Sequence, residues 1–336
     1  MPSMTIIKLA LLAGVVLAPA YASAGEFSAI YAFGDSLSDA GNAYIGTGGT
    51  EPASPPYASV NGYGVFSNGP VWVQDLSQAL GLGVLKPSLA GGTDFAVGGA
   101  SAGAFGSYMG SPGDLLPSAG NPLAESQLGM FQAAVPHPAV NALYTLSIGS
   151  NDLDYIFAAD AGNPAQELLD SQAVLGNIAD FVTGLVGDGA HDLIVLNVPD
   201  LGKTPDALAL GPIEAGEISS AVAAFDAGLA ATLDEIEAAT GADVHIVNDY
   251  ALVDEAVADP GAFDLTDVTD PCLVGVTVCA TPDTYLFWDG RHPTETGERL
   301  LARVAAQFVP EPGTAGLLGV AAVLLGIARR RPFFRK

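Results

Sequence analysis

The chain has 336 residues and carries 37 acidic against 11 basic residues, a net charge of −26. That charge argues against a nucleic-acid-binding surface, which depends on clustered lysine and arginine. Hydrophobic residues make up 49% of the chain and charged residues only 14%, so the chain can bury a substantial core and is not a disordered acidic polymer.

The first 24 residues have the three parts of a secretory signal peptide. Lys8 supplies a positive charge, an apolar run covers residues 9–18, and Ala22-Ser23-Ala24 has the small residues of a cleavage site. We therefore expect residues 1–24 to direct export and to be removed. The alternative is an N-terminal anchor or a buried helix, although the apolar run is short for a bilayer span.

Beyond residue 24, short apolar runs alternate with segments of helical periodicity. The runs have the length of buried parallel strands and lie at residues 29–33, 143–148, 193–198 and 244–247. Helices are predicted at residues 71–80, 124–134, 165–185, 213–239 and 293–308. This alternation predicts one α/β domain over residues 25–308, with a parallel sheet covered on both faces. The glycine- and proline-rich stretches 46–69 and 106–122 are predicted to be long loops.

The first predicted strand ends in the sequence G-D-S-L at residues 34–37. Its glycine permits a sharp turn, which places Ser36 where backbone N–H groups point outward and can stabilise a developing negative charge. Two further segments follow apolar runs: the glycine pair Gly98-Gly99 ends a strand-like run, and the sequence G-S-N-D at residues 149–152 follows the second predicted strand. Taken alone, Ser36 could be a helix cap, but these segments favour a catalytic site where the strands end.

The sequence D-x-x-H at residues 289–292 supplies a candidate base. A turn of this length can aim the Asp289 carboxylate at one imidazole nitrogen of His292 and leave the other nitrogen free to accept a serine proton. The alternative is an ordinary helix cap, which would leave His292 without a partner serine. The other three histidines are expected to be loop or core residues: His137, His191 and His245.

In their order along the chain, these four motifs resemble those of the GDSL, or SGNH, hydrolases. They span residues 34–292, nearly the whole of the chain between its two ends. The resemblance implies a flavodoxin-like α/β/α sandwich with a central parallel sheet, and a serine esterase or lipase. Such chemistry requires no metal and no other cofactor, because serine, histidine and backbone N–H groups carry it.

The resemblance also implies a role for each matching residue. Ser36 is the nucleophile, His292 is the general base, and Asp289 orients the imidazole. The oxyanion hole consists of the backbone N–H groups of Ser36 and Gly98 and the side-chain amide of Asn151.

The glycine segment leaves one choice open and contains one departure from the family pattern. Because two glycines are adjacent, the N–H of Gly99 is the alternative to that of Gly98. Asp94, at the head of this segment, stands where many relatives have asparagine. We expect that difference to matter locally without abolishing catalysis.

Two loop features precede the D-x-x-H motif. Cys272 and Cys279 are the only cysteines, and a disulfide between them is expected in an exported chain, with two buried thiols as the alternative. Three acidic residues of one loop could hold calcium, but a solvated acidic loop is the preferred interpretation: Asp264, Asp267 and Asp270.

The C-terminal residues 309–336 resemble a PEP-CTERM sorting signal. A Pro-Glu-Pro box at residues 310–312 precedes an apolar run at residues 315–328 and three arginines at residues 329–331. The resemblance implies export across the inner membrane of a Gram-negative bacterium and removal of the tail by an exosortase. The protein would then reside at the cell surface, in the extracellular matrix or in the medium. The alternative is a simple C-terminal anchor.

The sequence therefore predicts an exported hydrolase of carboxylic esters, with acyl lipids or lysophospholipids as substrates. O-Acetylated polysaccharide is the alternative substrate, and a surface or matrix protein that only binds is the alternative function. Residues 25–310 carry 36 acidic and five basic residues, a net charge of about −31. That charge would repel anionic lipid headgroups, nucleic acid and acidic glycans.

Overall fold

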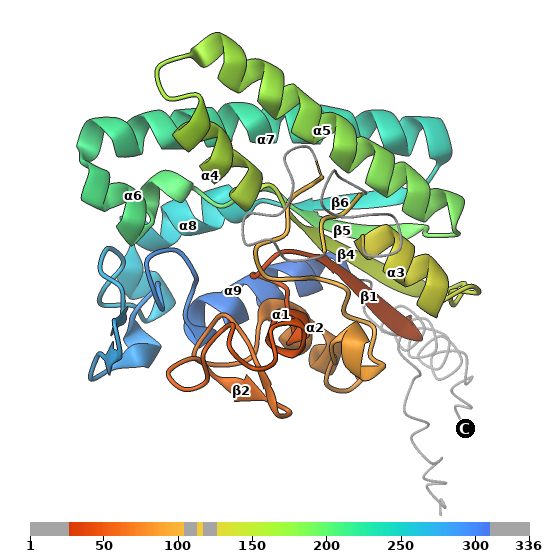
Figure 1. Cartoon of the computed structure of the whole chain (residues 1–336), viewed down its shortest axis with the longest axis horizontal. Coiled ribbons are helices and arrows are strands. Elements are labelled where there is room, and N and C mark those ends of the chain that lie inside the picture. Colours follow the sequence, from red (N-terminus) through yellow and green to blue (C-terminus); the bar gives the residue numbers. More distant parts are fainter. Residues whose placement is uncertain (1–26, 104–112, 117–125, 310–336) are drawn as a thin grey trace, which may run out of the picture. The chain divides into compact units, whose positions relative to one another are not determined.

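The computed structural model describes residues 27–103, 113–116 and 126–309. Four parallel strands form the central sheet in the order β1-β4-β5-β6 (Figure 1). Their bounds are Ala29–Gly34 for β1, Ala142–Ser147 for β4, Asp192–Leu196 for β5 and Asp243–Val247 for β6. Each strand begins within one residue of a predicted strand.

A fifth segment pairs with the outer edge of β1 without forming a regular strand. The N–H of Ala32 donates to the carbonyl of Thr93 (3.1 Å), and the N–H of Phe95 donates back to the carbonyl of Ala32 (2.7 Å). With this segment counted second in chain order, the sheet has the flavodoxin-like order 2-1-3-4-5. The predicted fold class, an α/β fold with a central parallel sheet, is confirmed.

Helices cover both faces of the sheet, because alternate strand residues point to opposite sides. Tyr31 and Phe33 of β1 belong to the apolar cluster of α3, α5 and α7, whereas Ile30 and Ala32 belong to that of α2 and α9. Figure 1 shows α5 and α7 on one side of the sheet and α2 and α9 on the other. The bounds are Trp72–Ala79 for α2, Gln127–Ala134 for α3, Pro164–Gly187 for α5, Pro212–Thr240 for α7 and Glu295–Ala305 for α9.

Four further helices surround the carboxyl ends of the strands: α1 (Asn42–Gly46), α4 (Ser150–Ala159), α6 (Pro205–Leu210) and α8 (Asp249–Ala258). None of them was predicted. The helix α4 begins inside the polar G-S-N-D motif, and α8 buries only Asp249 and Ala256, so neither has the apolar stripe that marks a core-facing helix. Short 3-10 turns occupy Ser88–Ala90, Leu201–Lys203, Pro260–Phe263, Pro282–Thr284 and Ala306–Phe308.

The predicted loop at residues 46–69 contains a small antiparallel ribbon of β2 (Ser59–Val60) and β3 (Tyr63–Gly64). A second ribbon, β7 (Leu273–Val274) with β8 (Thr277–Val278), lies between Cys272 and Cys279. These cysteines form a disulfide, which confirms that prediction.

The signal peptide predicted at residues 1–24, most of the loop predicted at residues 106–122, and the tail beyond residue 309 lie outside the described residues. The domain boundaries therefore stay predictions. Within the described ranges, no helix combines the length and the apolar character needed to cross a bilayer.

Candidate active site

Ser36 lies on a turn that follows β1 directly. The residue that leads into this turn, Gly34, has to be a glycine. Gly34 has a φ of +138°, and a Cβ atom on it would lie 2.1 Å from the carbonyl oxygen of Ser147 on β4. The amide of Gln127 brackets the same residue, accepting from the Gly34 N–H (2.9 Å) and donating to its carbonyl (2.7 Å). The turn that presents Ser36 is therefore fixed by the neighbouring strand and by α3.

The structure brings three of the predicted site residues together. The Ser36 Oγ atom lies 2.8 Å from Nε2 of His292, and Nδ1 of His292 lies 2.7 Å from Oδ2 of Asp289. The other carboxylate oxygen of Asp289 accepts the backbone N–H groups of Arg291 (2.9 Å) and His292 (2.8 Å). This arrangement can transfer the serine proton to an imidazole whose orientation is fixed by a carboxylate.

Asp289 is largely buried, and burial by itself would raise the pKa of its carboxyl group. The charge of His292, and hydrogen bonds from His292 and from Tyr57, outweigh burial and hold the pKa of Asp289 below its ordinary value. The carboxylate therefore stays ionised and can stabilise the imidazolium that forms when His292 takes a proton.

Two of the three predicted oxyanion donors are free to bind an oxyanion at the Ser36 hydroxyl. Within the described part of the chain, the backbone N–H of Ser36 has no hydrogen-bond partner. Asn151 is in the first turn of α4, and its side-chain amide donates one hydrogen bond to the carbonyl of Ala100 (2.9 Å). That bond holds the amide in place and leaves its second N–H free to donate.

The prediction that Gly98 supplies the third donor is wrong in this structure. The N–H of Gly98 already donates to Oδ2 of Asp39 at 2.8 Å. Packing explains the glycine at position 98, because a Cβ atom there would lie 2.3 Å from the ring of Phe66. The adjacent Gly99 has a φ of +79°, and among the described residues its N–H has no partner.

Asp94, the departure from the family pattern, joins the glycine segment to the turn after Ser36. Its two carboxyl oxygens accept the N–H groups of Ala40 (2.6 Å) and Ala96 (3.1 Å). Asp94 is fully buried, and burial together with the charge of Asp39 raises its pKa well above the ordinary value. The structure thus gives Asp94 a local supporting role and no contact with the catalytic side chains.

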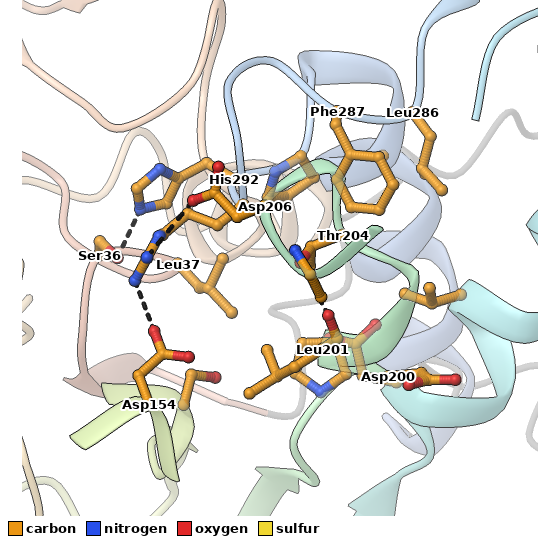
Figure 2. Close-up of a pocket in the computed structure, with 18 of the residues that line it drawn as sticks. Ser36, Leu37, Asp154, Asp200, Leu201, Thr204, Asp206, Leu286, Phe287 and His292 are labelled. Carbon is orange, nitrogen blue, oxygen red and sulfur yellow. Dashed lines mark hydrogen bonds and ion pairs between the residues drawn. The ribbon is translucent and has the colours of Figure 1, made fainter. Parts of the chain in front are cut away.

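A pocket of about 540 Å³ opens beside Ser36 and His292. Figure 2 shows these two residues on one side of the pocket, with Leu286 and Phe287 across from them. Helices α4, α6, α8 and α9, the start of α7 and the segment from Pro199 to Thr204 contribute much of the remaining lining. The wall is largely apolar, and its large apolar side chains are Leu37, Phe157, Leu201, Leu210, Ile218, Leu252, Val253, Leu286, Phe287, Leu300 and Leu301.

Carboxyl groups supply most of the charge of the pocket. Arg291, next to the catalytic histidine, forms ion pairs with Asp154 of α4 and with Asp206 of α6 (Figure 2). Burial raises the pKa of Asp35 to about 7 and that of Asp249 also to about 7. The pocket is therefore apolar with an acidic border, which suits an uncharged substrate.

The remaining sequence candidates lie away from this pocket. His191 and His245 have Asp192 and Asp243 as neighbours and do not line the cavity. In the acidic loop, Asp267 accepts backbone N–H groups of Thr269 and Asp270. Among the described residues, no group of three histidine, cysteine or acidic side chains is arranged to hold a metal ion.

Comparison with known proteins identifies the family. The model of the GDSL-like lipases and acylhydrolases matches residues 30–305. The chain belongs to this family. Its class is therefore that of the carboxylic ester hydrolases.

Three relatives illustrate the range of the family. A phosphatidylcholine-sterol acyltransferase of Aeromonas hydrophila is 32% identical over 249 residues, which cover 74% of this chain and 66% of that protein. A GDSL esterase/lipase of Arabidopsis thaliana is 26% identical, covering 83% of this chain and 90% of its own. Esterase EstA of Pseudomonas aeruginosa is 30% identical over 92% of this chain, which spans only half of EstA.

The solved structures with a partly similar chain path include an acetylxylan esterase and a lipase. The acetylxylan esterase Axe2 from Geobacillus stearothermophilus has a TM-score of 0.43 at 14% identity, covering 86% of this chain and 97% of its own. An extracellular lipase of Streptomyces rimosus has a TM-score of 0.41 at 16% identity, covering 83% of this chain and 99% of its own.

Proposed function

We propose that this chain is an exported esterase that hydrolyses uncharged carboxylic esters with an acyl chain longer than acetyl, through an acyl-enzyme on Ser36. The observation that carries the proposal is the juxtaposition of the Ser36–His292–Asp289 triad with the apolar pocket of about 540 Å³. A protein that only binds its ligand would not need a serine within 2.8 Å of an imidazole held by a buried carboxylate.

In the acylation step, the Ser36 Oγ atom attacks the ester carbonyl carbon while its proton passes to Nε2 of His292. The negative charge then resides on the former carbonyl oxygen, where the N–H groups of Ser36 and Gly99 and the amide of Asn151 stabilise it. Gly99 replaces Gly98 in this role, because the Gly98 N–H is already donated to Asp39. Collapse breaks the ester C–O bond, and the imidazolium of His292 gives its proton to the departing alcohol.

In the second step, a water molecule attacks the acyl group on Ser36. His292 accepts one proton from the water and returns it to the Ser36 oxygen as the acyl bond breaks. The products are an alcohol and a carboxylic acid, which ionises at neutral pH. The aspartates at the border of the pocket repel this anion and so favour its release.

The wall of the pocket supports an aliphatic acyl group. Burying one methylene in an apolar site contributes about 0.8 kcal/mol, which corresponds to about a fourfold gain in rate. An acetyl group would leave most of this pocket without contacts. Acyl lipids and other aliphatic esters are therefore the proposed substrates, in preference to O-acetylated polysaccharide.

A series of p-nitrophenyl esters tests this proposal on residues 25–310. From acetate to hexanoate the acyl group gains four methylenes, and kcat/KM is expected to rise by about 10² if most of that gain is realised in the transition state. A maximum at acetate would favour the acetyl-esterase alternative. Inactivity on every ester and on acetylated glycans would favour the protein that only binds.

Two valines of α8 supply a matched pair of variants. Val253 lines the pocket, whereas Val257, one helical turn later, does not. Val253→Trp should lower kcat/KM for hexanoate much more than for acetate, because the indole occupies space that the longer chain needs. Val257→Trp should leave the ratio of the two substrates unchanged. Equal ratios in both variants would contradict the location of the acyl group in this pocket.

Export and tail processing complete the proposal. The leader pattern at residues 1–24 and the Pro-Glu-Pro box, apolar run and terminal arginines after residue 309 support secretion followed by exosortase cleavage. The apolar run at residues 315–328 would span only about 21 Å as a helix, against a hydrocarbon core of about 30 Å. Such a segment suits transient retention better than permanent anchorage.

Intact-mass analysis of the protein from its own host tests this part. The mature chain is expected to begin near residue 25, to end near Glu311 and to lie outside the inner membrane. Recovery of residues 329–336 on most of the membrane-bound protein would contradict exosortase processing and favour a simple anchor.

A further inference from the structure

Tyr57, in the loop between α1 and α2, reaches the catalytic carboxylate from a distant part of the sequence. Its hydroxyl donates to Oδ2 of Asp289 at 2.6 Å. The same oxygen is 2.7 Å from Nδ1 of His292. One carboxylate oxygen therefore accepts from both the catalytic imidazole and a phenol that lies 232 residues earlier in the chain.

The phenol ring is held in place by its neighbours. It packs edge to face on Trp288, with ring centroids 6.3 Å apart, and on Phe66 at 6.4 Å. Phe66 in turn packs on the imidazole of His292, with ring centroids 5.3 Å apart. The main chain of Tyr57 is also fixed, since its carbonyl accepts a hydrogen bond from the hydroxyl of Ser54 (2.9 Å).

The electrostatics of the contact make Tyr57 a donor only. Burial, and then the charge and hydrogen bond of Asp289, raise the pKa of the Tyr57 phenol, so the hydroxyl keeps its proton. The hydroxyl does not line the substrate pocket. It can thus affect the reaction only through Asp289 and His292.

We propose that Tyr57 is a positioning residue of the triad, which fixes Asp289 and reduces the negative charge that this carboxylate presents to His292. The inference rests on the proposed esterase function. Both effects follow from sharing Oδ2: two donors restrict rotation of the carboxylate, and the phenol proton partly neutralises the oxygen that stabilises the imidazolium.

The other charged groups near these side chains remain in place when the hydroxyl is removed. Glu51 and Arg291 act on Tyr57, and Asp35 and Asp154 interact with the charge of His292. A change in pH dependence after loss of the Tyr57 hydroxyl would therefore report the hydrogen bond to Asp289.

The test compares Tyr57→Phe with Tyr63→Phe, a tyrosine of the same loop on β3. Removing the hydroxyl of Tyr57 should lower kcat about tenfold to a hundredfold, the range for a hydrogen bond to a charged group, with KM unchanged. The acid limb of the kcat/KM profile should move to higher pH, because an unshared Asp289 stabilises the imidazolium more strongly. Tyr63→Phe should change neither quantity.

A spectroscopic measurement separates this inference from the proposed function. The low-field proton resonance of the His292–Asp289 hydrogen bond should shift in Tyr57→Phe and not in Tyr63→Phe, whether or not any ester is cleaved. An unchanged resonance together with an unchanged acid limb would overturn the role of Tyr57. If Tyr57→Phe does not fold, Tyr57→Leu must show the same two shifts. Inactivity of the unmodified protein, with a shifted resonance in the variant, would contradict only the esterase function.

Discussion

Raising the pH from 5 to 8 should destabilise this protein, and Asp249 provides a measurable share of that effect. Asp249 lines the pocket at the start of α8 and is 5% exposed. Burial, followed by the charge of Asp226, raises its pKa from the ordinary value of 3.8 to about 7. The folded state therefore prefers the protonated acid. The contribution of Asp249 to the free energy of unfolding is complete below pH 4, and it is lost as the pH rises toward and through 7.

The magnitude follows from the difference between the two pKa values. About three units at 1.36 kcal/mol each give a contribution of about 4 kcal/mol at low pH, of which about 3 kcal/mol disappears between pH 5 and pH 8. For a domain of this size, 1 kcal/mol corresponds to about 2–4 °C in Tm. Asp249 should thus account for a decrease of about 5–10 °C in Tm over this interval.

Thermal unfolding of Asp249→Asn measures this contribution. Asparagine is neutral at every pH, so the decrease in Tm from pH 5 to pH 8 should be about 5–10 °C smaller in the variant than in the unmodified protein. Asp234→Asn, at an exposed position of α7, serves as the matched control and should leave the decrease unchanged. Equal behaviour of the two variants, or an unmodified protein that becomes more stable as the pH rises, would contradict this role of Asp249.

Two further predictions concern the oxyanion hole and the disulfide. Asn151→Ala should lower kcat by about 10²–10³ with little change in KM, because the lost amide acts mainly in the transition state. If the kcat of the variant in stopped-flow assays is within twofold of that of the unmodified enzyme, Asn151 does not have this role. Replacing Cys272 and Cys279 by alanine should reduce the free energy of unfolding in urea by about 2–3 kcal/mol, the loop-closure entropy of so short a loop. An unchanged urea midpoint would contradict that estimate.

The strands and the catalytic motifs were predictable because each carries a local signal. Both faces of β1 are buried, so its residues form an unbroken apolar run. Ser36 follows that run on a glycine turn, and Asp289 precedes His292 by three residues. Parallel strands end at one edge, which is why motifs more than 100 residues apart could be expected to meet there.

The parts that were missed depend on contacts between distant segments. The choice between Gly98 and Gly99 is decided by the carboxylate of Asp39, and adjacent glycines carry no signal that distinguishes them. Tyr57 lies in a glycine- and proline-rich stretch without periodicity, so its hydrogen bond to Asp289 has no local signature. The pocket is likewise assembled from helices such as α8 that lack a clear apolar stripe.

Covalent labelling of the proposed nucleophile tests directly whether Ser36 forms an acyl-enzyme. A fluorophosphonate should add one group per chain, and peptide mass spectrometry should locate it on Ser36, because among the serines that the structure describes this one has its Oγ atom 2.8 Å from the triad imidazole. The Ser36→Ala variant should remain unlabelled and should not hydrolyse p-nitrophenyl hexanoate. A label that persists in Ser36→Ala, or an unmodified protein that resists labelling, would contradict an acyl-enzyme on Ser36.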